Sequence, residues 1–391
     1  MLNRRDFLKI SGLSVVVPPA SKVFEALEIL NDRPLNAQTP PHHLHDDITP
    51  YGKLFIRNNG IPPEKLKNYA DYTLEIIGEV NKEKTYTINE LKSKFKSYSY
   101  NLVLECAGNG RAGFWPKVSG NQWTYGAIGQ PRWTGIRLKD LLEDVGLKSD
   151  SIYLGYYGRD THLSGVANVD TISRGVPLWK ALEETSLIAY QMNGEDIPLE
   201  HGYPLRLVCP GFPASVSGKW LKRIKICNKV HDGAKMTGDS YKIPITPLRP
   251  GEIVPVTEMR ILEDMPIKSL ITNPRSSLNW NFLQYKDNFI LEGKAWSGVY
   301  QNVSKENRGI VKKVEVSSDF GKTWIQANLN NSINPYAWQF FSVKIPITQK
   351  GYYEFWVRGH DAKTLQPMVV GPWNQKGYIN NACMRMCATF I

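Results

Sequence analysis

A cysteine in the segment 101–111 combines features that suit metal binding. Cys106 lies in Asn-Leu-Val-Leu-Glu-Cys-Ala-Gly-Asn-Gly-Arg, between an apolar run and a glycine-rich turn. The run predicts a short strand, and the turn allows tight backbone geometry. Arg111 follows five residues after the thiol, and a nearby cation favours the thiolate, which binds soft or high-valent metals. The pattern therefore indicates a metal ligand, against the alternative of a small core residue, the commoner role of a lone cysteine.

The sequence around and after this cysteine resembles the sulfite oxidase family of molybdenum enzymes. The resemblance covers about residues 50–391 and follows the order of the family's motifs. Besides 101–111, the matching segments are 122–129, 132–142, 187–194, His-Gly-Tyr-Pro-Leu-Arg at 201–206, Lys-Trp-Leu at 219–221, Ala-Trp-Ser at 295–297 and Trp-Asn at 373–374. The stretch 214–218 is nearer to bacterial haem-free sulfite dehydrogenases than to the animal and plant pattern.

The resemblance implies a molybdenum–molybdopterin cofactor. Cys106 would supply the protein thiolate, and the other equatorial sulfurs would come from the dithiolene of the pterin. The positions that hold this cofactor in the family are occupied by His201, Arg206 and Lys219, with Asn58, Asn59 and Asp170 as weaker candidates. Arginine and lysine suit the cofactor's phosphate because both are cationic hydrogen-bond donors. The alternative for each cation is a solvated position at a strand end.

The resemblance also implies an oxyanion pocket beside the metal. Arg57 and Arg111 fall where the family places guanidinium groups, and Lys235 is a weaker candidate for additional positive charge. Sulfite is a compact anion, so two planar donors would both neutralise and orient it. Tyr241 corresponds to the family's active-site tyrosine, whose phenol can hydrogen-bond an oxygen and assist proton transfer. Solvated arginines and a buried core tyrosine are the alternatives.

Two positions depart from the family's pattern. Where many relatives read Arg-Asn-His, this chain has Arg-Asn-Asn, ending at Asn59. A neutral amide thus replaces a titratable imidazole, and any pH dependence carried by that histidine should change. Lys376 stands where several relatives have arginine. We expect Lys376 to contact substrate with altered affinity, because lysine keeps the charge but loses the bidentate geometry.

Composition limits the partners. The chain has 391 residues, 42% of them hydrophobic, and a formal net charge of +11; this length predicts two domains. The basic residues are dispersed rather than interleaved with aromatics, which argues against nucleic acid and favours an anionic substrate, a phosphorylated cofactor and an acidic electron acceptor. The five cysteines lack Cys-x-x-Cys-His spacing, so no haem is predicted in this chain. Electrons would leave for a separate protein, such as a c-type cytochrome.

The amino-terminal sequence predicts the compartment. Residues 1–37 resemble a twin-arginine export signal, because paired arginines at positions 4 and 5 precede a short apolar run. The expected location is therefore the periplasm. In an oxidising compartment Cys383 and Cys387 could pair, and their spacing alone leaves that open.

Periodicity divides the remaining chain into an α+β domain and a β-sandwich. Residues 38–50 have turn composition and are predicted as a solvated linker, in spite of three histidines. In 51–245, strands such as 73–77 and 205–208 alternate with amphipathic helices at 138–145 and 178–185. In 250–391 the period shifts to two, which predicts an immunoglobulin-like sandwich. By resemblance, the first domain binds molybdopterin and the second mediates formation of a homodimer.

The expected activity is the oxidation of sulfite to sulfate, with water as oxygen source and an external electron acceptor. A sulfane dehydrogenase acting on a protein-bound sulfur chain is the alternative within the family. An exported binding protein that kept the fold and lost the metal chemistry is the alternative of another class.

Overall fold

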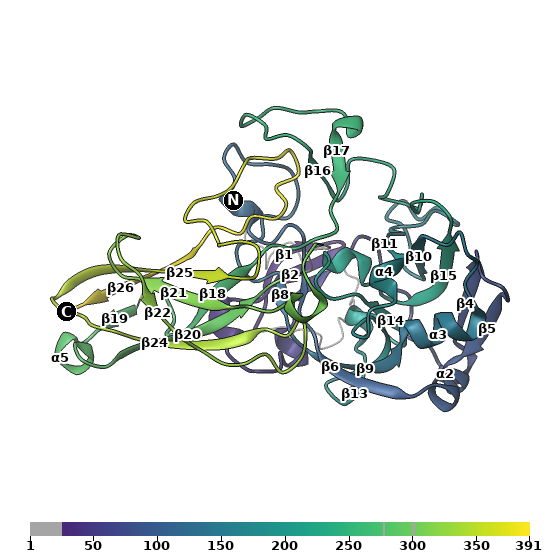
Figure 1. The fold of residues 1–391 in the computed structure, drawn as a ribbon, viewed down its shortest axis with the longest axis horizontal. Helices are drawn as coiled ribbons and strands as arrows, with labels where there is room; N and C mark the ends of the chain where they lie inside the picture. The colour runs from purple at the N-terminus through teal and green to yellow at the C-terminus, as the bar shows by residue number, and fades with distance from the viewer. Residues whose placement is uncertain (1–25, 277, 299–301) are drawn as a thin grey trace, which may run out of the picture.

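The structure is a computed structural model that describes residues 26–276, 278–298 and 302–391. These residues form two domains that lie side by side, a mixed α+β domain and a β-sandwich (Figure 1). The predicted α+β fold class is therefore confirmed. No helix in the described ranges is both long and apolar enough to cross a bilayer. The paired arginines of the predicted export signal lie outside these ranges.

Two five-stranded sheets build the first domain. One contains β4 (Thr73–Gly78), β5 (Lys84–Thr87), β10 (Tyr153–Gly158), β11 (Gly175–Pro177) and β15 (Leu221–Cys227). The other contains β6 (Ser97–Asn101), β9 (Arg132–Arg137), β12 (Leu187–Met192), β13 (Glu195–Asp196) and β14 (Arg206–Val208). The strand orders are β11-β10-β15-β4-β5 and β13-β12-β9-β6, with β14 paired to β12. The strands predicted at 73–77 and 205–208 correspond to β4 and β14.

Short helices pack against these sheets. They are α2 (Ile88–Lys94), α3 (Leu138–Val145) and α4 (Leu178–Ala181). A capping box between Thr87 and Glu90 starts α2, and α3 has the predicted bounds. The helix predicted at 178–185 ends early, at Ala181. Lys180 Nζ donates to the Glu183 carboxylate at 2.5 Å. Ser186 Oγ donates to the Lys180 carbonyl at 2.7 Å, so this carbonyl at the helix end has a hydrogen-bond partner.

The second domain is a sandwich of two sheets, one of four strands and one of five. The first sheet contains β18 (Lys268–Asn273), β20 (Phe289–Trp296), β23 (Asn328–Leu329) and β24 (Gln339–Ile345). The second contains β19 (Leu278–Trp280), β21 (Lys313–Ser317), β22 (Ile325–Gln326), β25 (Gly351–His360) and β26 (Met384–Phe390); a short helix, α5 (Phe282–Tyr285), precedes β20. Alternate residues of facing strands, such as Phe341 and Phe355, are fully buried between the sheets, as the period of two predicts.

The segment before Tyr51 is folded rather than a solvated linker. β1 (Glu28–Asp32) and β2 (Leu35–Gln38) form a hairpin whose second strand pairs with β3 (Ile56–Arg57). Leu44 is buried against the sandwich core, and the Thr49 hydroxyl accepts the Gln130 N–H at 2.8 Å. The ordered fold thus starts well before the predicted boundary, because these contacts come from residues far away in sequence.

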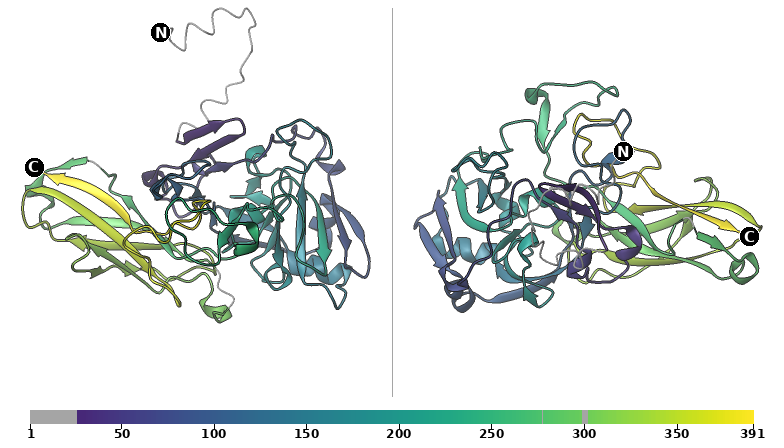
Figure 2. Two further views of the ribbon diagram at one scale, coloured as in Figure 1. Left: turned by 90° about the horizontal axis from the view of Figure 1, so that it is seen from above. Right: turned by 180° about the vertical axis from the view of Figure 1, so that it is seen from behind.

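Two two-stranded sheets complete the described fold, and Figure 2 shows the two domains side by side from two further directions. β7 (Leu104–Glu105) pairs with β8 (Ile128–Gly129), and β16 (Lys242–Pro244) pairs with β17 (Met259–Ile261). The predicted strand over 101–105 is interrupted, since β6 ends at Asn101 and β7 begins at Leu104. The break redirects the chain from the first domain toward the sandwich.

The pairing of Cys383 with Cys387 does not occur. Both thiols are free. Cys383 directly precedes β26 and Cys387 lies within it, and four residues of extended chain span about 13 Å. A disulfide needs Cα atoms within about 7 Å, so the strand holds the two thiols apart.

Candidate active site

Cys106 lies at the turn that follows β7. Its backbone N–H donates to the Ala127 carbonyl at 2.9 Å, and its own carbonyl accepts the Asn109 N–H at 2.9 Å. Gly110 has a φ of +91°, a left-handed conformation that glycine adopts without steric cost. Backbone hydrogen bonds within the turn and to Ala127 therefore shape it, and Cys106 lines a recess of the first domain.

Two pockets meet at Cys106. The inner pocket is lined by Cys106, Tyr156, Asp160, His201, Arg206, Ser215, Lys219, Trp220 and further apolar residues. The outer pocket opens to solvent and is lined by Asn36, Asn58, Arg111, Lys235, Lys376, Tyr378 and others. The residues that line both are Arg57, Asn59, Cys106 and Tyr241. Cys106 thus lies where the inner pocket meets the outer pocket.

The inner pocket contains the predicted cofactor residues His201, Arg206 and Lys219. Burial holds the pKa of His201 well below its usual range, with a further contribution from the two cations, so the imidazole is neutral. Burial also lowers the pKa of Arg206 to about 10. Lys219 Nζ donates to the Glu200 carbonyl at 2.8 Å and to the Asn58 side chain. Burial, with Arg206 nearby, lowers the Lys219 pKa.

These residues fit an anionic, hydrogen-bonding cofactor. Three buried nitrogens in or beside this pocket have no hydrogen-bond partner among the described residues: Asn58 Nδ2, His201 Nε2 and Arg206 Nε. Orphaned buried polar atoms are costly, and neither Arg206 nor Lys219 has a carboxylate within ion-pair distance in the described chain. A phosphorylated pterin would supply both the negative charge and the acceptors that these groups lack.

Asp170 was predicted to bind the cofactor, but the aspartate that lines the inner pocket is Asp160. Burial raises the pKa of Asp160, partly opposed by the charge of Lys219. Asp170 lines neither pocket; its carboxylate lies 4.0 Å from Lys222 Nζ and is partly exposed. The two aspartates are ten residues apart in one polar loop, and the position of Asp160 just after β10 was the available signal.

In the outer pocket the amide of Asn59 connects two cations. Its Oδ1 accepts from Arg57 Nη2 at 2.9 Å and from Lys235 Nζ at 3.1 Å. Arg57 Nη1 also donates to Asn36 Oδ1 at 3.3 Å. Asn36 was missed in the sequence because it lies within the predicted export signal. Asn59 therefore brings two positive charges together through a neutral amide.

Glycines surround the Arg111 side chain. A Cβ at Gly108 would lie 2.6 Å from Arg111 Nη2, and one at Gly120 would lie 2.8 Å from Nη1. Arg111 Nε donates to the Lys376 carbonyl and Nη1 to the Asn121 carbonyl, both at 3.0 Å. Each of these glycines leaves space for the guanidinium, which is held in place beside Cys106.

Tyr241 is held between aromatic and cationic groups. Its ring stacks on Tyr378 with centroids 5.6 Å apart, and the guanidinium carbon of Arg174 lies 4.5 Å from the ring centroid. The φ of Tyr241 is +55°, a strained conformation for a tyrosine that surrounding contacts must impose. Tyr241 lines both pockets and is also 5% exposed, packed in a small apolar cluster with Ile243, Leu262 and Tyr378.

Comparison with known proteins places this geometry in a family. Residues 59–235 match the oxidoreductase molybdopterin binding domain, and residues 259–389 match the Mo-co oxidoreductase dimerisation domain. The chain belongs to the sulfite oxidase family. Its cofactor is accordingly molybdenum–molybdopterin, and Cys106, His201, Arg206 and Lys219 all line the inner pocket.

Curated relatives and a solved structure agree over most of the chain. It is 29% identical over 374 residues to mitochondrial sulfite oxidase of Rattus norvegicus, covering 92% of this chain and 65% of the relative. It is 27% identical to sulfite oxidase of Gallus gallus, covering 92% of this chain and 77% of the relative. The sulfane dehydrogenase SoxCD from Paracoccus pantotrophus superposes with a TM-score of 0.74 at 26% identity, covering 96% of this chain and 91% of that chain.

Proposed function

We propose that this protein oxidises sulfite to sulfate in the periplasm, after twin-arginine export, and passes the electrons to a separate acceptor such as a c-type cytochrome. The balanced reaction takes sulfite and water to sulfate, two protons and two electrons. The observation that carries the proposal is the set of cations, Arg57, Arg111 and Lys235, around Cys106 in the outer pocket. A compact dianion is the ligand that such a site favours.

The chain's own residues would bind and orient the reactants. The bound cofactor supplies oxygen-atom transfer and two-electron redox chemistry. Arg57 and Arg111 would neutralise the sulfite oxygens, while the phenol of Tyr241 would hydrogen-bond an oxygen of substrate or product and carry a proton. Arg206 and Lys219 would neutralise the cofactor's phosphate, with neutral His201 as a hydrogen-bond partner.

Sulfane oxidation is the second candidate. It is supported by the likeness to SoxCD over nearly the whole of both chains and by the outer pocket's opening to solvent past Leu163, which is 43% exposed. An open entrance would admit a sulfur chain carried on a partner protein as well as a free ion.

Turnover assays separate these activities. Purified protein with quantified molybdenum would be tested for reduction of cytochrome c and ferricyanide with sulfite, thiosulfate and a protein-bound sulfane. Rapid turnover with free sulfite supports the proposal, whereas turnover with the sulfane alone replaces it. Cys106→Ala should abolish activity, and a variant with full sulfite oxidation would contradict the thiolate assignment.

A non-catalytic exported binding protein is tested by the same preparation, because it would lack stoichiometric molybdenum and turn over none of these substrates. The β-sandwich that matches a dimerisation domain supports a homodimer. Light scattering coupled to size-exclusion chromatography would measure the mass, and a monomer at assay concentrations would refute that part.

A further inference from the structure

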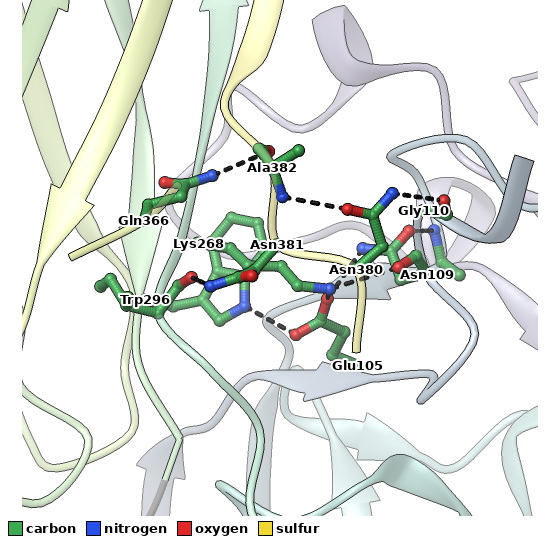
Figure 3. A network of polar contacts seen from close by, with 11 residues as sticks. Glu105, Asn109, Gly110, Lys268, Trp296, Gln366, Asn380, Asn381 and Ala382 are labelled. Atoms are coloured by element: carbon green, nitrogen blue, oxygen red, sulfur yellow. Dashed lines mark hydrogen bonds and ion pairs between the residues drawn. The ribbon is translucent and has the colours of Figure 1, made fainter. Parts of the chain in front are cut away.

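The carboxylate of Glu105, the residue directly before Cys106, is buried between the domains. Its Oε1 accepts from Lys268 Nζ at 2.6 Å and from Asn109 Nδ2 at 2.9 Å. Its Oε2 accepts from Trp296 Nε1 at 2.9 Å (Figure 3). Lys268 belongs to β18 and Trp296 to β20, both strands of the sandwich. Two of the three donors to this carboxylate therefore come from the second domain.

The same network ties Glu105 to the rest of the Cys106 turn. Lys268 Nζ also lies 3.3 Å from the Asn109 carbonyl. Asn109 Oδ1 in turn accepts the Ala127 N–H at 3.1 Å, and the Ala127 carbonyl accepts the N–H of Cys106. The Cys106 amide, the Asn109 side chain and the Glu105 carboxylate thus form one continuous set of hydrogen bonds.

Two further contacts from the second domain reach later residues of the same turn. The Ile379 N–H donates to the Ala107 carbonyl at 2.9 Å, and Asn380 Nδ2 donates to the Gly110 carbonyl at 2.7 Å (Figure 3). Both residues belong to the segment between β25 and β26. Residues of the second domain therefore bind the loop 105–111 near both of its ends.

The ion pair between Glu105 and Lys268 is shielded from solvent. Glu105 is 3% exposed and Lys268 5%, so neither charge has access to bulk water. A buried ion pair is tolerated when hydrogen bonds satisfy its remaining lone pairs and protons, and it is sensitive to loss of one partner. The indole N–H of Trp296 meets part of this requirement, so its removal would leave one carboxylate oxygen without its donor.

We infer that Glu105, Lys268 and Trp296 are positioning residues that fix the loop carrying Cys106, so that the β-sandwich completes the catalytic site of the first domain. This role is separate from dimerisation, because every contact lies within one chain. Groups behind a metal ligand commonly change activity when they are lost.

The test compares two indoles of the sandwich. Trp296→Phe removes the donor to Glu105 and keeps most of the packing. Trp338→Phe is the matched control. It removes a similarly buried indole N–H, whose acceptor is the Asp47 carbonyl, at 3.0 Å, and not Glu105. Amide hydrogen exchange across 104–111 would be measured by mass spectrometry on full-length protein, with and without cofactor, together with kcat and KM for sulfite.

In Trp296→Phe we expect the amides of Cys106 and Asn109 to exchange faster and kcat to fall about tenfold, a typical effect for a group behind a metal ligand. KM should hold, because Arg111 keeps its bonds to the Lys376 and Asn121 carbonyls. Unchanged exchange over 104–111, or equal changes in both variants, would overturn the inference.

The kinetic readout rests on the proposed sulfite oxidation, but the exchange readout does not. A loosened loop in a protein inactive toward sulfite would refute the function and leave the positioning role intact. If Trp296→Phe does not accumulate in soluble form, Asn380→Ala carries the same test, because this half-buried side chain holds the Gly110 carbonyl. Unchanged exchange there would likewise overturn the inference.

Discussion

Lys376 Nζ lies 2.6 Å from Asp239 Oδ2, at the rim of the outer pocket. The lysine that stands where relatives have arginine is therefore engaged by a carboxylate. Its side chain is only 25% exposed, against 44% for the aspartate. The positive charge available to an anion thus rests mainly on Arg57, Arg111 and Lys235, and Asp239 opposes it.

Asp239→Asn should strengthen anion binding, because it removes a negative charge and releases Lys376. We expect KM for sulfite to fall about threefold, within the range of 0–1 kcal/mol for a partly exposed pair, with kcat unchanged. The control is Asp46→Asn, which breaks the similarly exposed pair with Lys53 away from both pockets. Steady-state kinetics at low and high salt would check this, and a higher KM would show that Lys376 needs its partner to contact substrate.

Asn59→Ala should raise KM for sulfite about fivefold, because Arg57 and Lys235 would lose a shared acceptor worth about 1 kcal/mol. Asn59→Asp should be worse, since a carboxylate there would pair with both cations. Asn228→Ala, at an exposed amide that donates to Asp150, serves as control. A smaller effect of the aspartate than of the alanine would contradict the charge argument.

The amino-terminal hairpin should be needed for substrate affinity. Asn36 Oδ1 accepts the Asn58 N–H at 2.9 Å and contacts Arg57, so Asn36→Ala should raise KM severalfold and cost about 1 kcal/mol of stability. A chain starting at Ala26 should keep full activity, whereas one starting at Gln38, the first residue after the predicted signal, should lose affinity. Kinetics of the two truncated proteins decide this; equal KM values would refute the role of the hairpin.

Arg206→Met should separate stability from cofactor binding. The guanidinium is buried without an ion-pair partner in the described chain, so replacing it with an apolar side chain should stabilise the cofactor-free protein by about 1 kcal/mol. The same variant should retain much less molybdenum after purification. Thermal unfolding without cofactor and metal analysis measure the two effects. Normal molybdenum content would show that Arg206 does not hold the phosphate.

Glu315 should make the sandwich sensitive to acid. Burial alone would raise its pKa, but hydrogen bonds from Lys313, His360 and Arg358 lower the pKa from 4.5 to about 2. Between these two pKa values the unfolded chain binds a proton at Glu315 and the native state does not. The ionised Glu315 therefore contributes stability above pH 4.5, and this contribution is lost as the pH falls to about 2.

Glu315→Gln tests that window. Near neutral pH the variant should unfold at a lower temperature than the parent, because its free energy of unfolding should be smaller by about 2 kcal/mol. The difference should shrink as the pH falls toward 2. Calorimetry of both proteins across this range is the measurement, and a difference that persists unchanged at the acid end would exclude Glu315 as its source.

Local patterns predicted which residues line the pockets better than they predicted where the fold begins. Cys106 stands in a motif whose chemistry can be argued from the residues themselves, His201 and Arg206 follow from the resemblance to the sulfite oxidase family, and α3 follows from its periodicity. Residues 38–50 look like a linker because their composition suits turns, yet Leu44 is buried by the sandwich. Composition reports local preference, whereas burial depends on what the rest of the chain brings to the segment.

Long-range pairs escape sequence reasoning for the same reason. Glu105 and Lys268 are 163 positions apart, and nothing near either residue indicates the other. Asn36 and Asn58 form a similar pair across 22 positions. Such partners are brought together only by the topology of both domains, and a single sequence does not encode them in any local pattern.

Both domains form hydrogen bonds to loop 105–111, and this limits how the domains of this chain can be exchanged with those of relatives. Two family models divide the sequence at about residue 250, yet the hydrogen bonds of the catalytic turn cross that border. A chimaera that exchanges the sandwich with that of a relative would therefore transplant part of the reaction centre. Its success would depend on matching positions 268, 296 and 379–380 to the recipient's turn, more than on the linker between the domains.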